Sequence, residues 1–497
     1  MTINVTDTAT SAFLNQHPVR MLVDGQWVES ASGKTFDTIN PSSCQVLAKV
    51  AEGDAEDINR AVAAARKAFE SGPWPKLTPS QRGQLLWKVA DLIEQHAEEL
   101  AQLETLDNGK PIKYSRAGDV PLTADHFRYF AGWATKLEGD TIPVSVTNMF
   151  TYTLREPVGV VGQIIPWNFP LQMAAWKMAP ALACGNTVIL KPAEQTPLTA
   201  LRLGELICEA GFPAGVVNVV PGFGETAGAA LAAHPGVDKI AFTGSTEVGK
   251  KILQASIDNL KRVTLELGGK SPNIIFPDAD LKYAVRGAMN AIFFNQGQVC
   301  TAGSRLFIQK SIYDQVLSGL TGYASKMKLG PGIDPATDLG PLVSQEQLDR
   351  VTGYIEAGKR EGAIPTTGGT PPSDDQLQGY FMQPTVFDNV HDDMTIAREE
   401  IFGPVVAALP FEDIEEVAAR ANKSMYGLAA GVWTSDVKKA HKVAAALKTG
   451  VVWVNTYNQF DAAAPFGGYK QSGYGREMGH AVLDAYTQIK TVWINLR

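Results

Sequence analysis

The spacing of hydrophobic positions changes at about residue 157. Between about residues 55 and 107, apolar residues recur at helical spacing, as in INRAVAAARKAF and LLWKVADLIEQHAEELAQLETL, which predicts amphipathic helices. Short β-branched and apolar runs then take over, namely VGVVGQII, NTVILKP, GVVNVVPG and KIAFTG, with helix-like stretches such as PLTALRLGELICEAG between them. A repeated strand and helix predicts a parallel sheet with crossover connections.

A second series of strand candidates follows Gly268 and comprises PNIIF, SRLFIQ, PTVF, GPVVAALPF, AAGVWT and GVVWVN. This series predicts a second α/β domain. Residues 358–379 are rich in turn formers and predict an exposed loop or hairpin within that domain.

Two alternating runs, TIPVSVTNMFTYTLREP and YTQIKTVWINLR, fit neither domain. As free edges they would be prone to aggregation, so we expect them to pair with another subunit. The sequence therefore predicts a homodimer or homotetramer.

Length and charge narrow the class of protein. A chain of 497 residues exceeds one hydrophobic core and predicts at least two domains. The net charge of -8 argues against a nucleic-acid partner. The N-terminal residues lack a signal-peptide pattern, and no run approaches the roughly 20 apolar residues of a membrane span. We expect a cytoplasmic protein with no membrane partner.

The cysteines are scattered and lack the Cys/His spacing of a zinc site, so no metal is predicted. They are Cys44, Cys184, Cys208 and Cys300. Only Cys300, in FFNQGQVCTAGSR, lies among small and polar residues between two glycines. A thiolate there is a candidate nucleophile, and neighbouring backbone N–H groups would hold an oxyanion. On these residues alone, a small buried side chain is the more common explanation.

Glu266 precedes a pair of glycines in LELGGKSPN, where a strand ends and the chain turns sharply. A carboxylate so placed is a candidate base. A glutamate alone is more often a surface charge or a helix cap, so the assignment of Glu266 as a base depends on its pairing with Cys300.

Seven motifs in order resemble the aldehyde dehydrogenase superfamily, in its NAD-dependent, non-phosphorylating, phenylacetaldehyde dehydrogenase-like form. They are PWNFP, KPAEQTP, FTGSTEVGK, LELGGK, FNQGQVC, EEIFGPV and PFGGYKQSG. The resemblance extends from about Leu22 to the end of the chain. It implies an aldehyde dehydrogenase-like α/β fold with two parallel-sheet domains and a small β oligomerisation arm.

The resemblance also implies the catalytic roles. Cys300 matches the nucleophile, and the side-chain amide of Asn168 with the Cys300 N–H would hold the oxyanion. Loss of a hydride to the nicotinamide would leave a thioester. Glu266 matches the residue that activates water, which favours an acid over an acyl-CoA as product. Without the resemblance, Asn168 between prolines would be a structural turn residue.

The cofactor motif departs from the standard dinucleotide fingerprint. PGFGETAG offers Gly222, Gly224 and Gly228 with one residue too many before the last glycine. The resemblance instead implies that Gly244 and Ser245 lie at a strand-to-helix turn near the pyrophosphate. Gly224 and Gly228 would flank the adenine side.

Lys191 and Glu194 match the residues that hold the adenosine ribose, and a carboxylate there disfavours a 2′-phosphate. We therefore expect NAD as cofactor. Glu400 and Phe402 match the pair that orients the nicotinamide ribose, with Gln347 a weaker match; a surface charge is the alternative for Glu400. The full implied cofactor set is Ile164, Pro166, Trp167, Lys191, Glu194, Gly224, Gly228, Phe242, Gly244, Ser245, Val248, Leu267, Gln347, Glu400 and Phe402.

The implied substrate tunnel is aromatic and uncharged, which suits an apolar or aromatic aldehyde such as phenylacetaldehyde. An amino, betaine or aliphatic aldehyde is the alternative substrate, and a position in the hydrophobic core is the alternative for Trp176 and Phe294. The implied lining is Phe169, Met173, Trp176, Phe294, Thr301, Phe460 and Phe466.

Three other functions stay open. A CoA-acylating dehydrogenase is disfavoured by Glu266. A cysteine hydrolase needs a histidine base, and the seven histidines fall in none of the matched motifs. A structural protein on the same fold is disfavoured by the intact set of site residues.

We predict the following division of the chain. Residues 1–138 and 157–267 form a discontinuous NAD-binding domain, and residues 268–468 form the catalytic domain. Residues 139–156 and 469–497 form the oligomerisation segments.

Overall fold

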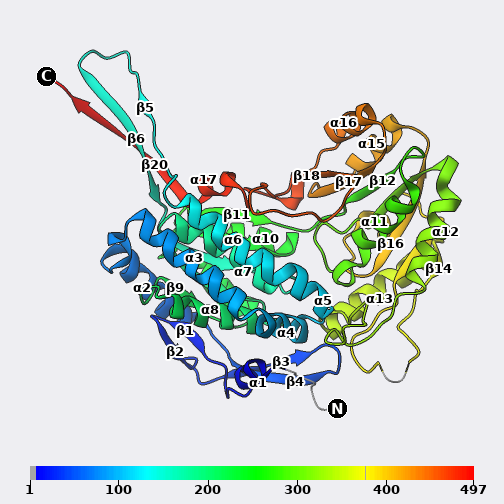
Figure 1. Cartoon of the computed structure of the whole chain (residues 1–497), viewed down its shortest axis with the longest axis horizontal. Helices are drawn as coiled ribbons and strands as arrows, with labels where there is room; N and C mark the ends of the chain where they lie inside the picture. The colour runs from blue at the N-terminus through cyan, green and yellow to red at the C-terminus, as the bar shows by residue number, and fades with distance from the viewer. Residues whose placement is uncertain (1–6, 375–376) are drawn as a thin grey trace.

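Two large sheets with helices on their faces organise the chain, and a narrow three-stranded arm projects from it (Figure 1). The structure is a computed structural model that describes residues 7–374 and 377–497. The predicted α/β class, with two mainly parallel sheets and a small β arm, is confirmed.

The first sheet has the strand order β19-β11-β10-β7-β8-β9-β1-β2. Its parallel centre consists of β7 (Val160–Ile164), β8 (Thr187–Lys191), β9 (Val217–Val219), β10 (Lys239–Thr243) and β11 (Arg262–Glu266). From β7 the chain builds β8 and β9 on one side and then crosses to β10 and β11 on the other. Ligands of such sheets bind outside the carboxyl ends of the strands, where the order reverses.

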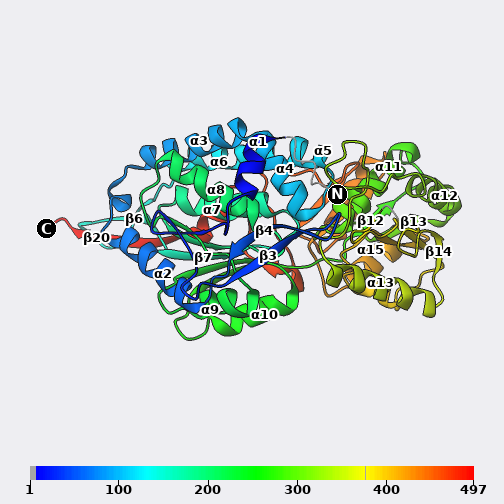
Figure 2. The same ribbon diagram turned by 90° about the horizontal axis from the view of Figure 1, so that it is seen from below.

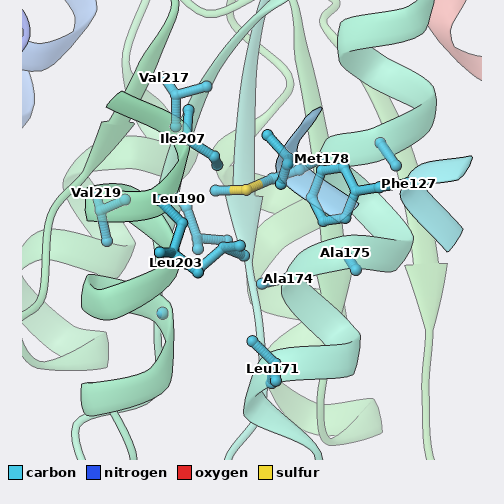
Figure 3. Close-up of a cluster of buried hydrophobic side chains, with 14 of the residues drawn as sticks. Phe127, Leu171, Ala174, Ala175, Met178, Leu190, Leu203, Ile207, Val217 and Val219 are labelled. Carbon is cyan, nitrogen blue, oxygen red and sulfur yellow. The ribbon is translucent and has the colours of Figure 1, made fainter. Parts of the chain in front are cut away.

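Both faces of the first sheet are covered, which explains why its strands read as apolar runs. Val161 and Leu190 pack into one core, whereas Val160 and Ile189 pack into the other. Figure 2 shows helices on both sides of this sheet. Figure 3 shows side chains of the first core, including Met178, packed beside β8. The flanking helices are α3 (Pro79–Gln95), α6 (Val120–Trp133), α7 (Pro170–Ala183) and α8 (Leu198–Ala210) on one face, and α2 (Ala55–Glu70), α9 (Ala229–Ala233) and α10 (Thr246–Ala255) on the other.

The second sheet has the order β14-β15-β16-β13-β12-β17-β18. All six predicted strands are present, as β12 (Pro272–Ile275), β13 (Arg305–Gln309), β15 (Thr385–Asp388), β16 (Val405–Phe411), β17 (Ala429–Trp433) and β18 (Val451–Val454). The helices around them are α11 (Leu281–Phe293), α12 (Tyr313–Ala324), α13 (Gln345–Arg360), α14 (Thr395–Arg398), α15 (Ile414–Asn422) and α16 (Val437–Ala446).

The turn-rich segment 358–379 contains regular structure as well as loop. Helix α13 continues to Arg360, and β14 (Ile364–Thr367) pairs antiparallel with β15, so the hairpin alternative holds. Residues 375 and 376 of this segment lie outside the described residues.

The two alternating runs pair with each other across more than 300 residues of sequence. β6 (Met149–Pro157) is antiparallel to β20 (Thr487–Asn495), from Thr487 opposite Pro157 to Asn495 opposite Met149. β5 (Thr141–Ile142) adds a third strand to this sheet. Each run thus forms backbone hydrogen bonds along one edge of the other run. Pairing with a second subunit stays a prediction.

Several strands near the N-terminus and one near the C-terminus were not predicted. β1 (Met21–Val23), β2 (Gln26–Val28) and β19 (Gly473–Tyr474) extend the first sheet, whereas β3 (Thr35–Asn40) and β4 (Gln45–Ala51) form a separate hairpin. The predicted helical region is confirmed as α2, α3 and α4 (Ala97–Asn108). Across the described residues, every helix is too short or too polar to span a membrane.

Candidate active site

The carboxyl ends of three neighbouring strands meet at one edge of the first sheet. In the parallel register, Ile164 of β7 lies opposite Phe242 of β10, and Thr243 lies opposite Glu266 of β11. The segments that follow these strands are therefore neighbours, and they line a cavity of about 500 Å³. Loops of the second sheet complete its wall.

This cavity brings together most of the predicted site residues. Those that line it are Cys300, Glu266 and Asn168 of the catalytic set, Pro166, Trp167, Gly244, Ser245, Leu267, Gln347, Glu400 and Phe402 of the cofactor set, and Phe169, Met173, Trp176, Phe294, Phe460 and Phe466 of the substrate set. Those outside the lining are Ile164, Lys191, Glu194, Gly224, Gly228, Phe242, Val248 and Thr301. Thr301 is fully buried, and its Oγ1 donates to Asn458 Oδ1 at 2.9 Å.

A strained turn presents Cys300 to the cavity. Asn295, Gln296 and Gly297 have successive φ values of 46°, 58° and 72°. A Cβ on Gly297 would lie 2.0 Å from the carbonyl oxygen of Gly403, so the position requires glycine. Such strain persists only where surrounding contacts fix it, and it concentrates at functional sites.

The surroundings of Cys300 favour the neutral thiol over the thiolate. Burial, followed by the charges of Glu400 and Glu266, raises its pKa to about 12. The backbone N–H groups of Thr301 and Cys300 act in the opposite direction and favour the thiolate. Attack on a substrate therefore requires transfer of the thiol proton to a base within the cavity.

Glu266 is a carboxyl group suited to accept a proton. It is buried, and within the described part of the chain no side chain donates a hydrogen bond to its carboxylate, although the backbone N–H of Gly468 favours the ionised form. Burial and the nearby Glu477 raise its pKa well above the usual value, and Lys177 partly offsets them. Lys177 Nζ in turn donates to Glu477 Oε1 at 2.7 Å and to Thr243 Oγ1 at 2.6 Å. A raised pKa makes the Glu266 carboxylate a stronger proton acceptor than an ordinary glutamate.

Asn168 uses one of its two side-chain amide hydrogens in a hydrogen bond within the protein. Its Nδ2 donates to the carbonyl oxygen of Gln298 at 2.9 Å, and a side-chain amide carries two hydrogens. Asn295 and Asn108 donate to the Asn168 carbonyl at 2.9 and 3.4 Å and fix its backbone. The second Nδ2 hydrogen is therefore available to an oxyanion formed at Cys300.

The nucleophile turn packs tightly on Gly269, which yields a test of its placement. A Cβ at Gly269 would lie 2.4 Å from the Cys300 carbonyl oxygen. We expect Gly269→Ala to displace Cys300 and to lower kcat by about 10²-fold, the cost of a misplacement of roughly 1 Å. Steady-state NADH formation measures this change. Gly322→Ala is the matched control because its added Cβ would meet no atom within 4 Å; equal activity of the two variants would contradict the tight packing.

The groups beside β8 and β10 fit a dinucleotide. Ser245 caps α10, and the N-terminus of this helix at the cavity suits a pyrophosphate. At the end of β8, Lys191 Nζ donates to Glu194 Oε2 at 2.9 Å, and such a carboxylate suits ribose hydroxyls. A Cβ on Gly224 would meet no atom within 4 Å, so open space lies over this turn.

Hydrogen bonds fix the residues that the sequence predicts for the nicotinamide ribose. Gly269 N–H donates to Glu400 Oε1 at 2.8 Å, and burial raises the pKa of Glu400 to about 7. Gln347 Nε2 donates to the Phe402 carbonyl at 2.7 Å. The rings of Trp167 and Phe402 meet edge to face at 5.3 Å. Glu400 is therefore a half-buried cavity residue that accepts a hydrogen bond from Gly269, which argues against the surface-charge alternative.

Two groups of rings form the predicted aromatic wall. Phe169 stacks on Phe294 with ring centroids 5.9 Å apart. Trp176, Phe460 and Phe466 form a triangle with centroid distances of 5.3 to 6.0 Å. All five rings line the cavity, so none is solely a core residue.

Sequence reasoning missed several polar residues of the wall. Asp119, Gln172, Arg350, Asn458 and Gln459 line the cavity and belong to no predicted set. Helical spacing offers one signal, because Gln172 lies four residues before Trp176 in α7 and so shares its face.

Comparisons with known proteins agree with this geometry. The model of the aldehyde dehydrogenase family matches residues 27–492. Human mitochondrial aldehyde dehydrogenase is 55% identical over 488 residues, which cover 97% of this chain and 94% of the human one.

Solved structures are equally similar. The NAD⁺ complex of an aldehyde dehydrogenase from Bacillus cereus has a TM-score of 0.97 and 56% identity, with 99% of each chain covered. A betaine aldehyde dehydrogenase from Staphylococcus aureus has a TM-score of 0.95 and 45% identity, with 97% and 98% covered. The resemblance predicted from the seven motifs is confirmed, and the chain belongs to the aldehyde dehydrogenase family.

Proposed function

We propose that the protein oxidises an aromatic or apolar aldehyde, of the phenylacetaldehyde type, to the carboxylic acid with NAD as the acceptor. One observation carries the proposal: Cys300, Glu266 and Asn168 line a single cavity whose walls include five aromatic rings. Burial of an apolar substrate against these rings favours binding.

The reaction begins at Cys300. Its thiol proton passes to a base, and the sulfur bonds to the aldehyde carbon. The carbonyl oxygen becomes an oxyanion, which the second Nδ2 hydrogen of Asn168 and the Cys300 N–H stabilise. Collapse of this adduct expels a hydride and leaves the acyl group on sulfur as a thioester.

Glu266 completes the turnover. Its carboxylate takes a proton from water, and the hydroxide formed adds to the thioester carbon. The C–S bond then breaks, the acid leaves, and the Cys300 thiol is restored. A buried carboxylate beside the thioester favours water over coenzyme A, which argues against a CoA-acylating enzyme.

NAD, when bound, supplies the hydride acceptor. Lys191 and Glu194 would hold the adenosine ribose, Ser245 at the start of α10 would face the pyrophosphate, and Glu400 would hold the nicotinamide ribose. The Glu194 carboxylate disfavours the 2′-phosphate of NADP through charge repulsion.

Neutralisation of Glu194 tests the cofactor assignment. We expect Glu194→Gln to raise kcat/KM with NADP relative to NAD by about tenfold, because the repelling charge is lost. NADH and NADPH formation by the same enzyme stock measures the ratio. Glu415→Gln is the control, because Glu415 is an exposed residue of α15 that pairs with Lys442 and does not line the cavity. An unchanged ratio in the Glu194 variant would show that another group sets the preference.

A panel of aldehydes tests the substrate class. Phenylacetaldehyde and benzaldehyde are compared with hexanal, betaine aldehyde and aminobutyraldehyde. We expect kcat/KM to favour the arylaldehydes by about tenfold or more, which is about 1.4 kcal/mol of transition-state discrimination. A preference for hexanal or for the cationic aldehydes would support the alternative substrates and overturn the arylaldehyde proposal.

The arm supports an oligomer. Its three strands expose Phe150 and Leu154 on one face and Ile142, Ile489 and Trp493 on the other, and so many exposed apolar side chains on one element favour contact with a second subunit. We infer a homodimer or homotetramer, and light scattering of the purified protein tests it, with a monomer as the contrary result. The predicted domain boundaries and a cytoplasmic location are likewise proposals.

A further inference from the structure

The tunnel wall contains a polar pair among its aromatic rings. Gln172 lies in the first turn of α7, and Asp119 ends the π-helical turn η2 (Ser115–Asp119) that leads into α6. Both line the cavity. Gln172 shares its helix face with Phe169 and Trp176, so it belongs to the substrate side of the cavity.

The hydrogen bond between these residues fixes which end of the amide is free. Gln172 Nε2 donates to Asp119 Oδ1 at 2.8 Å. A carboxylate only accepts, so the NH₂ end of the amide must face Asp119. Throughout the described chain, no group donates to Gln172 Oε1, and this residue lines the cavity. The wall therefore offers a hydrogen-bond acceptor.

Buried charges hold this acceptor in place. Lys110 Nζ donates to Asp119 Oδ2 at 2.8 Å and to Glu104 Oε1 at 3.1 Å, and all three side chains are buried. Lys110 Nζ also lies 4.3 Å from the centroid of the Phe169 ring. The positive charge of Lys110 thus offsets the negative charge of Asp119, which weakens the attraction of this carboxylate for a cationic substrate.

We propose that Gln172 Oε1 accepts a hydrogen bond from a hydroxyl group on the aldehyde, and that the preferred substrates are hydroxyl-bearing arylaldehydes. Gln172 is then a specificity-determining residue, and Asp119 and Lys110 are positioning residues. The inference rests on the proposed arylaldehyde function. An aldehyde without a donor leaves the buried acceptor unpaired, which costs free energy and makes the site discriminate.

The test compares matched aldehydes. Phenylacetaldehyde is measured against its 2-, 3- and 4-hydroxy derivatives, and kcat/KM is obtained for wild type and for Gln172→Met, which keeps the length and removes the acceptor. We expect wild type to favour the best hydroxylated isomer by about fivefold, the size of one neutral hydrogen bond, and the variant to lose this preference. Met173→Leu, a neighbouring wall change without a hydrogen bond, should alter both members of each pair alike.

A measurement on the unaltered protein covers the case in which Gln172→Met folds poorly. Calorimetry compares binding of phenylacetamide and its hydroxylated derivatives, which resemble the substrates but do not react. We expect about fivefold tighter binding of the best hydroxylated amide. Equal binding, or a hydroxyl preference that survives in Gln172→Met, would overturn the proposal.

Failure of the arylaldehyde function has a different signature. In that case hexanal outperforms every arylaldehyde, and the pair of hexanal and 6-hydroxyhexanal replaces the aryl pair. A hydroxyl preference that depends on Gln172 then still supports the acceptor role, whereas its absence overturns it.

Discussion

Cys300→Ala is expected to lower kcat/KM for aldehyde oxidation by about 10⁵-fold, because removal of a covalent nucleophile leaves only binding and oxyanion stabilisation. NAD binding should persist, since Lys191 and Glu194 lie outside the lining of the cavity that contains the thiol. NADH formation and calorimetric NAD titration measure the two properties.

The control for this variant is Cys208→Ala, a half-buried thiol on α8 that does not line the cavity. It should retain activity within about twofold. Turnover by Cys300→Ala at a rate near that of wild type would contradict the nucleophile assignment.

Glu266→Gln is expected to lower kcat by about 10²- to 10³-fold, because the amide keeps the shape of the side chain but cannot take a proton from water. The pH dependence should change as well. In wild type, kcat rises with pH as Glu266 ionises, and the rise lies at higher pH than for an ordinary glutamate since burial raises the pKa of this group. This limb of the kcat profile should vanish in the variant.

Glu415→Gln provides the matched control for Glu266→Gln, because Glu415 is an exposed residue of α15 paired with Lys442. Its kcat and pH profile should stay within about twofold of wild type. A Glu266 variant that retains the wild-type limb would show that another group activates water.

Much of the fold could be predicted because its strands are buried on both faces. VGVVGQII and GPVVAALPF read as continuous apolar runs, which is typical of parallel strands under helices. β1 and β2 have only three residues each, too few to show a period. The pairing of β6 with β20 could not be predicted from the sequence either, because nothing in either run specifies a partner more than 300 residues away.

The site was predictable only as far as local motifs extend. Cys300 and Glu266 lie in motifs that contain glycines, and Phe169, at the N-cap of α7, lies at helical spacing from Trp176 within that helix. Phe460 and Phe466 are remote in sequence from both motifs, and only the resemblance implied them. The charges beneath the site were missed because their partners are remote in sequence: Lys177 pairs with Glu477, and Gln172 bonds Asp119. The φ values of Asn295 and Gln296 are likewise fixed by tertiary contacts rather than by residue type.

The most direct test of the covalent mechanism is peptide mass spectrometry of Glu266→Gln after reaction with NAD and phenylacetaldehyde and an acid quench. We predict an acyl adduct on the peptide that contains Cys300, because the thioester forms but its hydrolysis lacks a base. NADH formation without any adduct, or an adduct on Cys44, Cys184 or Cys208 instead, would contradict the account.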